Sequence, residues 1–230
     1  MVRFEQYSGV LFDLHGVIAD SSQYHLQAWH QLADELEITW TPKLAATLLG
    51  MNRQESVATI LTAGRKLDQY SDAQQAELGE RKNKMYLDII SHMSPADVLP
   101  GIIRFLDELQ ANHYGIVLAS ASVNAPLEIH KMQLEKYFPL IVDPSTLTRN
   151  KPDPEIYVRA ASMLNLPPKA CFGIEDSKPG LAAVNGSGAL SVGVGSRAEI
   201  ATAQVRFSST ASLTLAGIQQ QLVAKQEQAD

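Results

Sequence analysis

A short apolar run near the start of the chain ends abruptly in a carboxylate. Residues 8–20 read SGVLFDLHGVIAD, so the apolar run VLF is followed directly by Asp13 and, three residues later, by Gly16. Such a run, ended by a charge and a glycine, is typical of a buried parallel strand whose C-terminal end opens into a loop. Open α/β sheets bind their ligands at that end of the strands, which makes Asp13 a candidate site residue. An Asp that merely caps a turn is the alternative.

The segment that follows this strand contains helical patterns and no convincing strand. Within residues 21–93 we predict a helix with Ser21 or Ser22 as N-cap, a short helix over 44–49, a break at 50–52, and helices over 54–63 and 72–90. A connection of this length is unusual inside a compact domain. We therefore interpret it as an inserted helical subdomain.

From residue 94 onward, strand patterns alternate with helical ones. Strands are expected at 115–120, 140–143, 170–174, 190–194 and 205–207, and helices at 101–111, 125–134, after Pro154, at 179–187 and at 213–224. This alternation predicts βαβ units that build one parallel sheet. The expected fold is α/β, with a Rossmann-like core of residues 1–20 and 94–230 and an α-helical insertion of residues 21–93.

The composition argues against several classes of protein. A net charge of −6 disfavours broad binding to nucleic acid or to acidic membranes, which requires basic patches. Because Cys171 is the single cysteine, an internal disulfide framework and a cysteine-rich metal site are excluded. No run approaches the ~18 apolar residues of a membrane span, and residues 1–6 carry no signal-peptide pattern. We expect a cytoplasmic protein without nucleic-acid or membrane partners.

Polar side chains follow several of the predicted core strands, where parallel strands bring their ends to one sheet edge. They are Asp13, Ser120, Lys151, Glu175 and Asp176. Carboxylate oxygens suit Mg²⁺, whereas a hydroxyl and an ammonium are suitable donors to phosphate oxygens. A carboxylate beside a metal ion can attack a phosphoryl group. These residues therefore predict a Mg²⁺-dependent phosphoryl-transfer site.

Four segments, in this order, resemble motifs of the haloacid dehalogenase superfamily: FDLHGVIAD, LASAS, NKPDPEIY and GIEDSKPGLAAVNGSGALSVGVG. HLQAW and GMNRQES, in the helical segment, resemble parts of the cap of its β-phosphoglucomutase family. The resemblance implies a Rossmann-like core whose helical cap closes over the substrate and excludes water. It also implies that a monomer with one Mg²⁺ converts β-D-glucose 1-phosphate into glucose 6-phosphate, through a phospho-aspartate and β-glucose 1,6-bisphosphate.

The resemblance gives the core positions specific roles. Asp13 would be the nucleophile and a Mg²⁺ ligand. Asp176 would be a second ligand, Glu175 a ligand or its close support, and His15 would offer its backbone carbonyl to the metal. Ser120 and Lys151 would hold the phosphoryl group.

Further positions match residues that contact the sugar phosphate in this family. In the cap they are His25, Arg53 and Lys82, with Trp29 as an additional candidate, and in the core Ser122 and Asn124 would face the second phosphate. Packing is the alternative for His25 and Trp29. A solvated charge is the alternative for Arg53 and Lys82.

Two positions depart from the family pattern. His15 stands where the family has the Asp that acts as general acid and base, and Val123 stands where close relatives have a Lys for the distal phosphate. His15 is either an acid/base itself, the cause of weak activity, or a substitution in an otherwise competent mutase. A sugar-phosphate phosphatase and a catalytically silent sugar-phosphate-binding protein remain the alternatives to a mutase.

Overall fold

The computed structural model describes residues 4–48 and 51–227. The chain divides into two compact units, one formed by residues 1–20 and 94–230 and the other by residues 21–93. Leu49 and Gly50, which the sequence assigns to a helix end and a break, lie outside the described residues.

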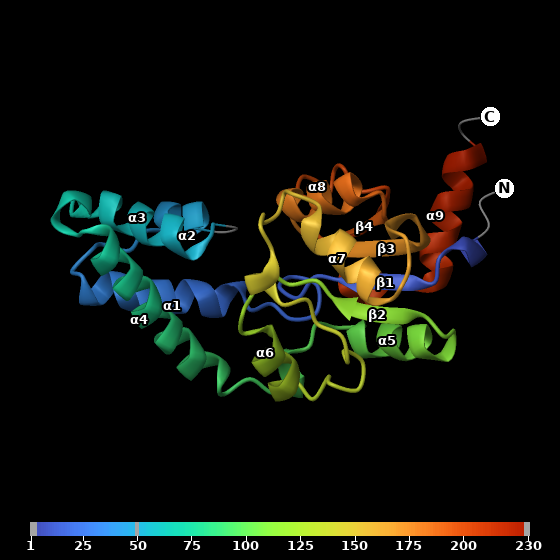
Figure 1. Ribbon diagram of the computed structural model, residues 1–230, viewed down its shortest axis with the longest axis horizontal. Helices are drawn as coiled ribbons and strands as arrows, with labels where there is room; N and C mark the ends of the chain where they lie inside the picture. Colours follow the sequence, from blue (N-terminus) through green and yellow to red (C-terminus); the bar gives the residue numbers. More distant parts are fainter. Residues whose placement is uncertain (1–3, 49–50, 228–230) are drawn as a thin grey trace. The chain divides into compact units, whose positions relative to one another are not determined.

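The larger unit is built on a five-stranded parallel sheet in the order β2-β1-β3-β4-β5 (Figure 1). Its strands are β1 (Gly9–Phe12), β2 (Gly115–Leu118), β3 (Cys171–Glu175), β4 (Leu190–Val194) and β5 (Val205–Phe207). Every residue of β1, β3 and β4 is buried, as expected for parallel strands covered on both faces. The predicted α/β fold with a parallel sheet is confirmed.

The register of the sheet determines which residues meet at its C-terminal edge. Phe12, the last residue of β1, pairs with Leu118 of β2 and with Ile174 of β3. Asp13 and Glu175 each come one residue later, so the two carboxylates lie side by side where the strands end. The edge predicted to carry the site is thus formed by the pairing of β1 with its two neighbours.

Helices cover both faces of the sheet. They are α5 (Ile102–Ala111), α6 (Ala125–Lys131), α7 (Glu155–Met163), α8 (Lys178–Ser187) and α9 (Leu215–Glu227). Leu11 of β1 packs in one buried cluster with Ala160 of α7 and Val184 of α8. Phe12, whose side chain points the other way, meets Phe105 of α5 edge-on at 6.1 Å between ring centroids. The strand that precedes Asp13 is therefore fixed from both faces.

The strand expected at residues 140–143 is wrong. This segment forms a single isolated bridge, between Ile141 and Leu118 of β2. Pro139 and Pro144 bracket it, and neither has the backbone N–H that a longer ladder would need. Short 3-10 turns occur at Phe4–Gln6, Leu67–Gln69, Pro95–Asp97, Pro144–Thr146, Pro168–Ala170 and Thr210–Ser212.

The smaller unit is helical in its described residues. It contains α1 (Ser22–Glu35), α2 (Pro42–Leu48), α3 (Arg53–Ala63) and α4 (Asp72–Ile90), which share a buried apolar cluster that includes Trp29 and Ile60. Asn52 and Ser71 cap α3 and α4 with their side chains. Ser21 is the N-cap of α1, as expected, but it has ψ near 0° instead of extended backbone, and its side chain makes no capping hydrogen bond.

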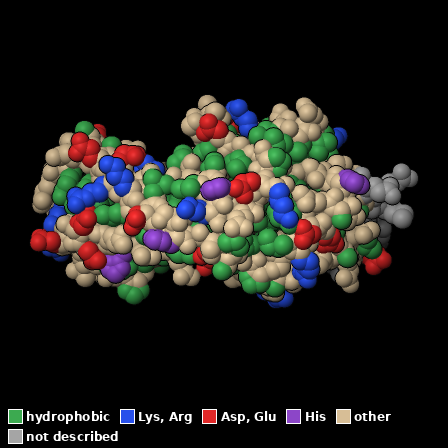
Figure 2. All heavy atoms as spheres, turned by 90° about the horizontal axis from the view of Figure 1, so that it is seen from below, with side chains coloured by type: hydrophobic (Ala, Val, Ile, Leu, Met, Phe, Trp, Pro, Cys, Tyr) green, Lys and Arg blue, Asp and Glu red, His purple; other side chains and the backbone are tan. Residues whose placement is uncertain are grey.

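The helices found within residues 4–48 and 51–227 are all too short or too polar to cross a membrane. On the face drawn in Figure 2, basic and acidic side chains are interspersed.

Candidate active site

Three carboxylates meet at the C-terminal edge of the sheet. Asp13 follows β1, Glu175 ends β3, and Asp176 follows it. One oxygen from each lies within 4.8 Å of the others. The Asp13 N–H donates to the carbonyl of Ile174 at 3.0 Å, which holds the first carboxylate against the neighbouring strand. Asp13 is 9% exposed and Glu175 fully buried, so two of the three charges are largely removed from water.

Lys151 provides the positive charge of this cluster. Its Nζ donates to Asp13 Oδ1 at 2.7 Å and to Glu175 Oε1 at 2.6 Å. Burial by itself would lower the pKa of Lys151, but the two carboxylates outweigh it and raise that pKa above its usual value. The lysine therefore stays charged and binds the nucleophile candidate and its neighbour together.

One ammonium does not neutralise three carboxylates. Burial, together with the charges of Asp13 and Glu175, raises the pKa of Asp176 to about 7. Burial likewise raises the pKa of Asp13, and the ammonium of Lys151 offsets only part of that effect. A crowded set of oxygen donors with surplus negative charge fits a hard divalent cation such as Mg²⁺.

Two side chains that the sequence did not single out hold Glu175 in place. The Tyr157 hydroxyl on α7 donates to Glu175 Oε1 at 2.7 Å, and the Ser177 hydroxyl donates to Oε2 at 3.0 Å. Ser177 also accepts from the N–H of Gly180, so it caps α8 at the same time. Tyr157 lies within the NKPDPEIY segment, but its pattern gives no sign that the hydroxyl faces a carboxylate.

Gly16 is required by the loop that follows β1. Its φ of +77° is one that residues with a side chain rarely adopt, and a Cβ there would lie 2.0 Å from Asp176 Oδ2. Gly16 N–H donates to the carbonyl of Ala19 at 2.8 Å and closes a tight loop. This loop brings the backbone against the third carboxylate.

The His15 imidazole contacts a residue from a different element. Its Nε2 lies 3.1 Å from Glu128 Oε2, and Glu128, on α6, is fully buried. Burial lowers the pKa of His15, but the hydrogen bond and charge of Glu128, with the charge of Asp13, reverse that effect and leave the pKa raised. Glu128 was not predicted from the sequence. The feature that could have indicated it is a charged residue on the helix face that also carries the buried Ala125 and Ile129.

The LASAS segment folds into a loop of hydroxyl groups beside His15 and Glu128. Ser120 is 2% exposed, and its Oγ accepts the N–H of Ser122 at 3.2 Å. Ser122 donates to Glu128 Oε1 at 3.3 Å and accepts the N–H of Asn124 at 3.2 Å. The structure thus links Ser120, Ser122 and Asn124 with His15 through Glu128.

The candidate residues of the helical unit form one cluster and one separate pair. Lys82 is 4% exposed, and its Nζ lies 2.7 Å from His25 Nδ1 and 4.6 Å from the ring centre of Trp29. Trp29 is 5% exposed and belongs to the apolar cluster of this unit. Arg53 instead forms an ion pair with Glu80 of α4, partly open to solvent.

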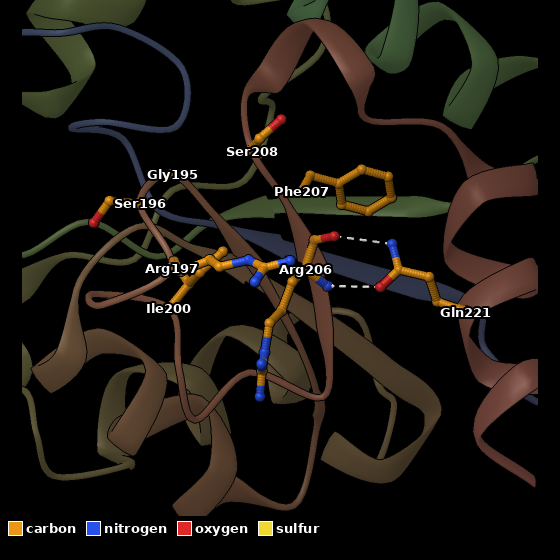
Figure 3. Close-up of a pocket in the computed structure, with 8 residues that line it drawn as sticks. All are labelled: Gly195, Ser196, Arg197, Ile200, Arg206, Phe207, Ser208 and Gln221. Carbon is orange, nitrogen blue, oxygen red and sulfur yellow. Dashed lines mark hydrogen bonds between the residues drawn. The ribbon is translucent and has the colours of Figure 1, made fainter. Parts of the chain in front are cut away.

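Two hollows lie next to one another along the end of β4. The smaller, about 300 Å³, is lined in part by Gly16 and Asp176 and therefore borders the carboxylates. The larger, about 890 Å³, is drawn in Figure 3, where the Arg206 backbone pairs with the Gln221 side chain. The Arg206 guanidinium donates to the carbonyls of Ala201 and Ala203, so this side chain stabilises the loop that precedes β5. The smaller hollow is the one relevant to the site.

Known proteins resemble this chain over most of its length. Residues 7–188 match the family model of haloacid dehalogenase-like hydrolases, and the chain belongs to this family. It is 40% identical over 206 residues to a protein named beta-phosphoglucomutase from Bacillus subtilis, covering 90% of this chain and 91% of the relative.

Two further relatives mark the range of the family. A crystal structure of beta-phosphoglucomutase from Clostridium difficile superposes with a TM-score of 0.88 at 34% identity, covering 96% of this chain and 99% of that one. A protein from Thermotoga maritima named phosphorylated carbohydrates phosphatase is 25% identical, covering 78% of this chain and 81% of the relative. The family therefore includes proteins named for phosphoryl isomerisation and others named for phosphate release.

Proposed function

We propose that this protein transfers phosphoryl groups between sugar phosphates and that its reaction is the conversion of β-D-glucose 1-phosphate into glucose 6-phosphate. The observation that carries the proposal is the convergence of Asp13, Lys151, Glu175 and Asp176 at one sheet edge. The 40% identity to the Bacillus subtilis protein supports the choice of reaction. A carboxylate beside a bound ammonium is a suitable nucleophile for phosphorus.

Mg²⁺ is the metal ion that the cluster fits. Asp13, Asp176 and Glu175 would hold it, with the backbone carbonyl of His15 as a further ligand. When bound, Mg²⁺ withdraws charge from the phosphoryl oxygens and so favours attack on phosphorus. The raised pKa values of Asp13 and Asp176 support this assignment, because a cation would offset both the burial and the neighbouring negative charges that raise them.

The chemistry of the chain's own residues consists of two phosphoryl transfers. Phosphorylated Asp13 gives its phosphoryl group to O6 of β-glucose 1-phosphate; the P–O bond to Asp13 breaks, and the O6 proton passes to a base. The product, β-glucose 1,6-bisphosphate, turns round in the site. Asp13 then attacks the phosphorus of the C1 phosphate, the P–O1 bond breaks, and O1 takes up the proton. Glucose 6-phosphate leaves, and Asp13 is phosphorylated again.

We propose that the side chain at position 15 takes up the O6 proton and returns it to O1. His15 lies two residues after the nucleophile, where the resemblance places an acid/base, and an imidazole can carry a proton near neutral pH. It differs in length and charge from the Asp of the family, so we propose that it limits the rate of transfer. Lys151 and Ser120 would hold the transferred phosphoryl group.

The remaining candidates would contact the sugar phosphate. Ser122 and Asn124 lie on the loop that Glu128 connects to His15, and their hydroxyl and amide would bind the distal phosphate. In the helical unit, Lys82, His25 and Arg53 would supply donors to the phosphate or the sugar. Trp29 is the least suited, since nearly all of its surface is buried within that unit.

A sugar-phosphate phosphatase is the second candidate function. Val123 is 56% exposed and offers no charge for a distal phosphate, which weakens selection for a bisphosphate. The Thermotoga maritima relative carries a phosphatase name. In this reaction, water instead of a sugar hydroxyl would accept the phosphoryl group from Asp13.

The products of one incubation distinguish the candidates. The protein is incubated with Mg²⁺, β-glucose 1-phosphate and a trace of β-glucose 1,6-bisphosphate, and glucose 6-phosphate and inorganic phosphate are both measured. We expect glucose 6-phosphate from the native chain and none from Asp13→Asn. Phosphate release alone, across several sugar phosphates, would favour the phosphatase. Ligand binding with neither product would indicate a silent binding protein.

A further inference from the structure

Glu128 is a buried charge that the proposed chemistry does not use. It lies on α6 between Ala125 and Ile129, is fully buried, and occupies a position that would suit an apolar side chain. Burying a carboxylate is unfavourable unless charged or hydrogen-bonded partners compensate for the lost water. The other buried carboxylates of the described chain, Asp13 and Glu175, bind Lys151. Glu128 forms an ion-pair contact with His15.

This contact joins two elements that lie far apart in the sequence. His15 and Glu128 are separated by 113 positions, and Nε2 of the imidazole lies 3.1 Å from one Glu128 oxygen and 3.4 Å from the other. Ser122 donates to the same carboxylate at 3.3 Å and so restrains it from a second side. The carboxylate is fixed by burial and by the hydroxyl, which makes it a rigid partner for a side chain on a loop.

We propose that Glu128 is a positioning residue for His15, so that the two side chains form one functional pair in place of the single Asp of the family. A group that exchanges a proton with a substrate oxygen must be held in a narrow range of positions. A carboxylate bound to one ring nitrogen sets the orientation of an imidazole in the same way in catalytic triads and metal sites. This role rests on the proposed phosphoryl transfer at Asp13.

A paired arrangement predicts that neither residue can be changed independently. His15→Asp alone places a second carboxylate near the buried Glu128, and repulsion between them displaces the new side chain from the reacting oxygen. Removing the charge with Glu128→Leu then relieves the repulsion. The same substitution at 128 is therefore harmful beside His15 and beneficial beside an Asp.

The kinetic test compares native protein, Glu128→Gln, Glu128→Leu, His15→Asp and the double variant His15→Asp/Glu128→Leu. With Mg²⁺, β-glucose 1-phosphate and a trace of β-glucose 1,6-bisphosphate, we expect Glu128→Gln to lower kcat by about tenfold or more while KM changes by less than about threefold. We expect Glu128→Leu to raise kcat in the His15→Asp background. An equal loss in both backgrounds would overturn the proposal, because it would show that Glu128 only supports the fold.

A matched control uses the exposed pair formed by His130 and Glu135. Glu135→Gln also removes one carboxylate from a His–Glu contact, and we expect native kcat and KM. Thermal unfolding of each variant verifies folding. If Glu128→Leu does not fold, the double variant His15→Asp/Glu128→Gln replaces it, because Gln keeps the shape of the Glu side chain.

A readout that does not depend on turnover separates this proposal from the proposed function. The imidazole NMR signals of His15 are assigned by their absence in His15→Asp. We expect Glu128→Gln to shift them, and Glu135→Gln to shift only those of His130. His15 signals unaffected by Glu128→Gln would refute the positioning role. If the signals shift but no variant, the double variant included, transfers phosphoryl groups, the pair exists and the proposed function has failed.

Discussion

Three carboxylates around one ammonium create an electrostatic imbalance at the scale of single residues. Lys151 binds Asp13 and Glu175 directly, which leaves Asp176 as the least compensated group. Burial, together with the charges of Asp13 and Glu175, raises its pKa to about 7. In the proposed enzyme the surplus charge has a use, because it is what attracts Mg²⁺ to the nucleophile.

The raised pKa of Asp176 predicts pH-dependent binding of Mg²⁺. Below about pH 7 the metal-free protein holds a proton on Asp176, which the metal must displace. Apparent affinity therefore falls with falling pH, by roughly tenfold per unit, and levels off above pH 7. Isothermal titration with Mg²⁺ from about pH 5.5 to about pH 8 measures it. Affinity that stays constant over this range would show that Asp176 is not a ligand.

The backbone conformation of Gly16 leads to a second prediction for a single residue. In Gly16→Ala the new methyl group would collide with Asp176 Oδ2, so we expect weaker Mg²⁺ binding as well as a loss of about 1 kcal/mol in the free energy of unfolding. Gly188→Ala is the control, since its φ of +84° is similar and its Cβ meets no atom within 4 Å. It should lose similar stability and keep native Mg²⁺ affinity. Equal affinities in the two variants would contradict the role of Gly16.

At the scale of elements, the ends of strands and helices provide most of the site. Asp13 directly follows β1, Glu175 is the last residue of β3, and α8 begins beside Ser177. The Ser177 hydroxyl both caps α8 and donates to Glu175. One side chain thus couples the start of a helix to the metal-ligand candidates.

Removing this hydroxyl tests the coupling. Ser177→Ala should lower the free energy of unfolding by about 1 kcal/mol through the lost cap, and should also weaken Mg²⁺ binding. Ser71→Ala is the matched control, because Ser71 caps α4 in the other unit in the same way. Denaturant unfolding and Mg²⁺ titration of both variants measure the two effects. The coupling fails if both variants bind Mg²⁺ with native affinity.

The helices and strands also show which parts of the site can be predicted from sequence patterns. Asp13 and Glu175 were predictable because each directly follows an apolar run in the sequence, and parallel strands end at one edge. Tyr157 and Glu128 were not, because each lies within a helix and only the packing of that helix reveals its partner. The strand at 140–143 was wrong for a related reason: apolar content is local, whereas pairing depends on flanking prolines and on the neighbouring strand.

The whole molecule consists of two units with separate apolar cores. The core of the larger unit includes Leu11 and Val184, and that of the helical unit includes Trp29 and Ile60. The sequence indicated this division, because residues 21–93 contain helical patterns without a strand while the rest alternates. The placement of one unit against the other depends on side chains in both, which no local pattern encodes.

Separate cores predict a local response to the metal. A cation that binds only the folded larger unit stabilises it by mass action and slows its opening. We expect Mg²⁺ to slow amide hydrogen exchange in β1 and β3 while exchange in α3 and α4 stays as in metal-free protein. Asp176→Asn should abolish the effect. Equal slowing in both units would show that they open together.

In the proposed reaction, Asp13 accepts the phosphoryl group. The most direct measurement is transfer of radiolabelled phosphate from β-glucose 1,6-bisphosphate to the protein in the presence of Mg²⁺, followed by acid quenching and peptide mapping. We predict label on the peptide that contains residues 8–20, sensitive to hydroxylamine as an acyl phosphate is, and absent from Asp13→Asn. Label on any other peptide, or label that persists in Asp13→Asn, would contradict the claim.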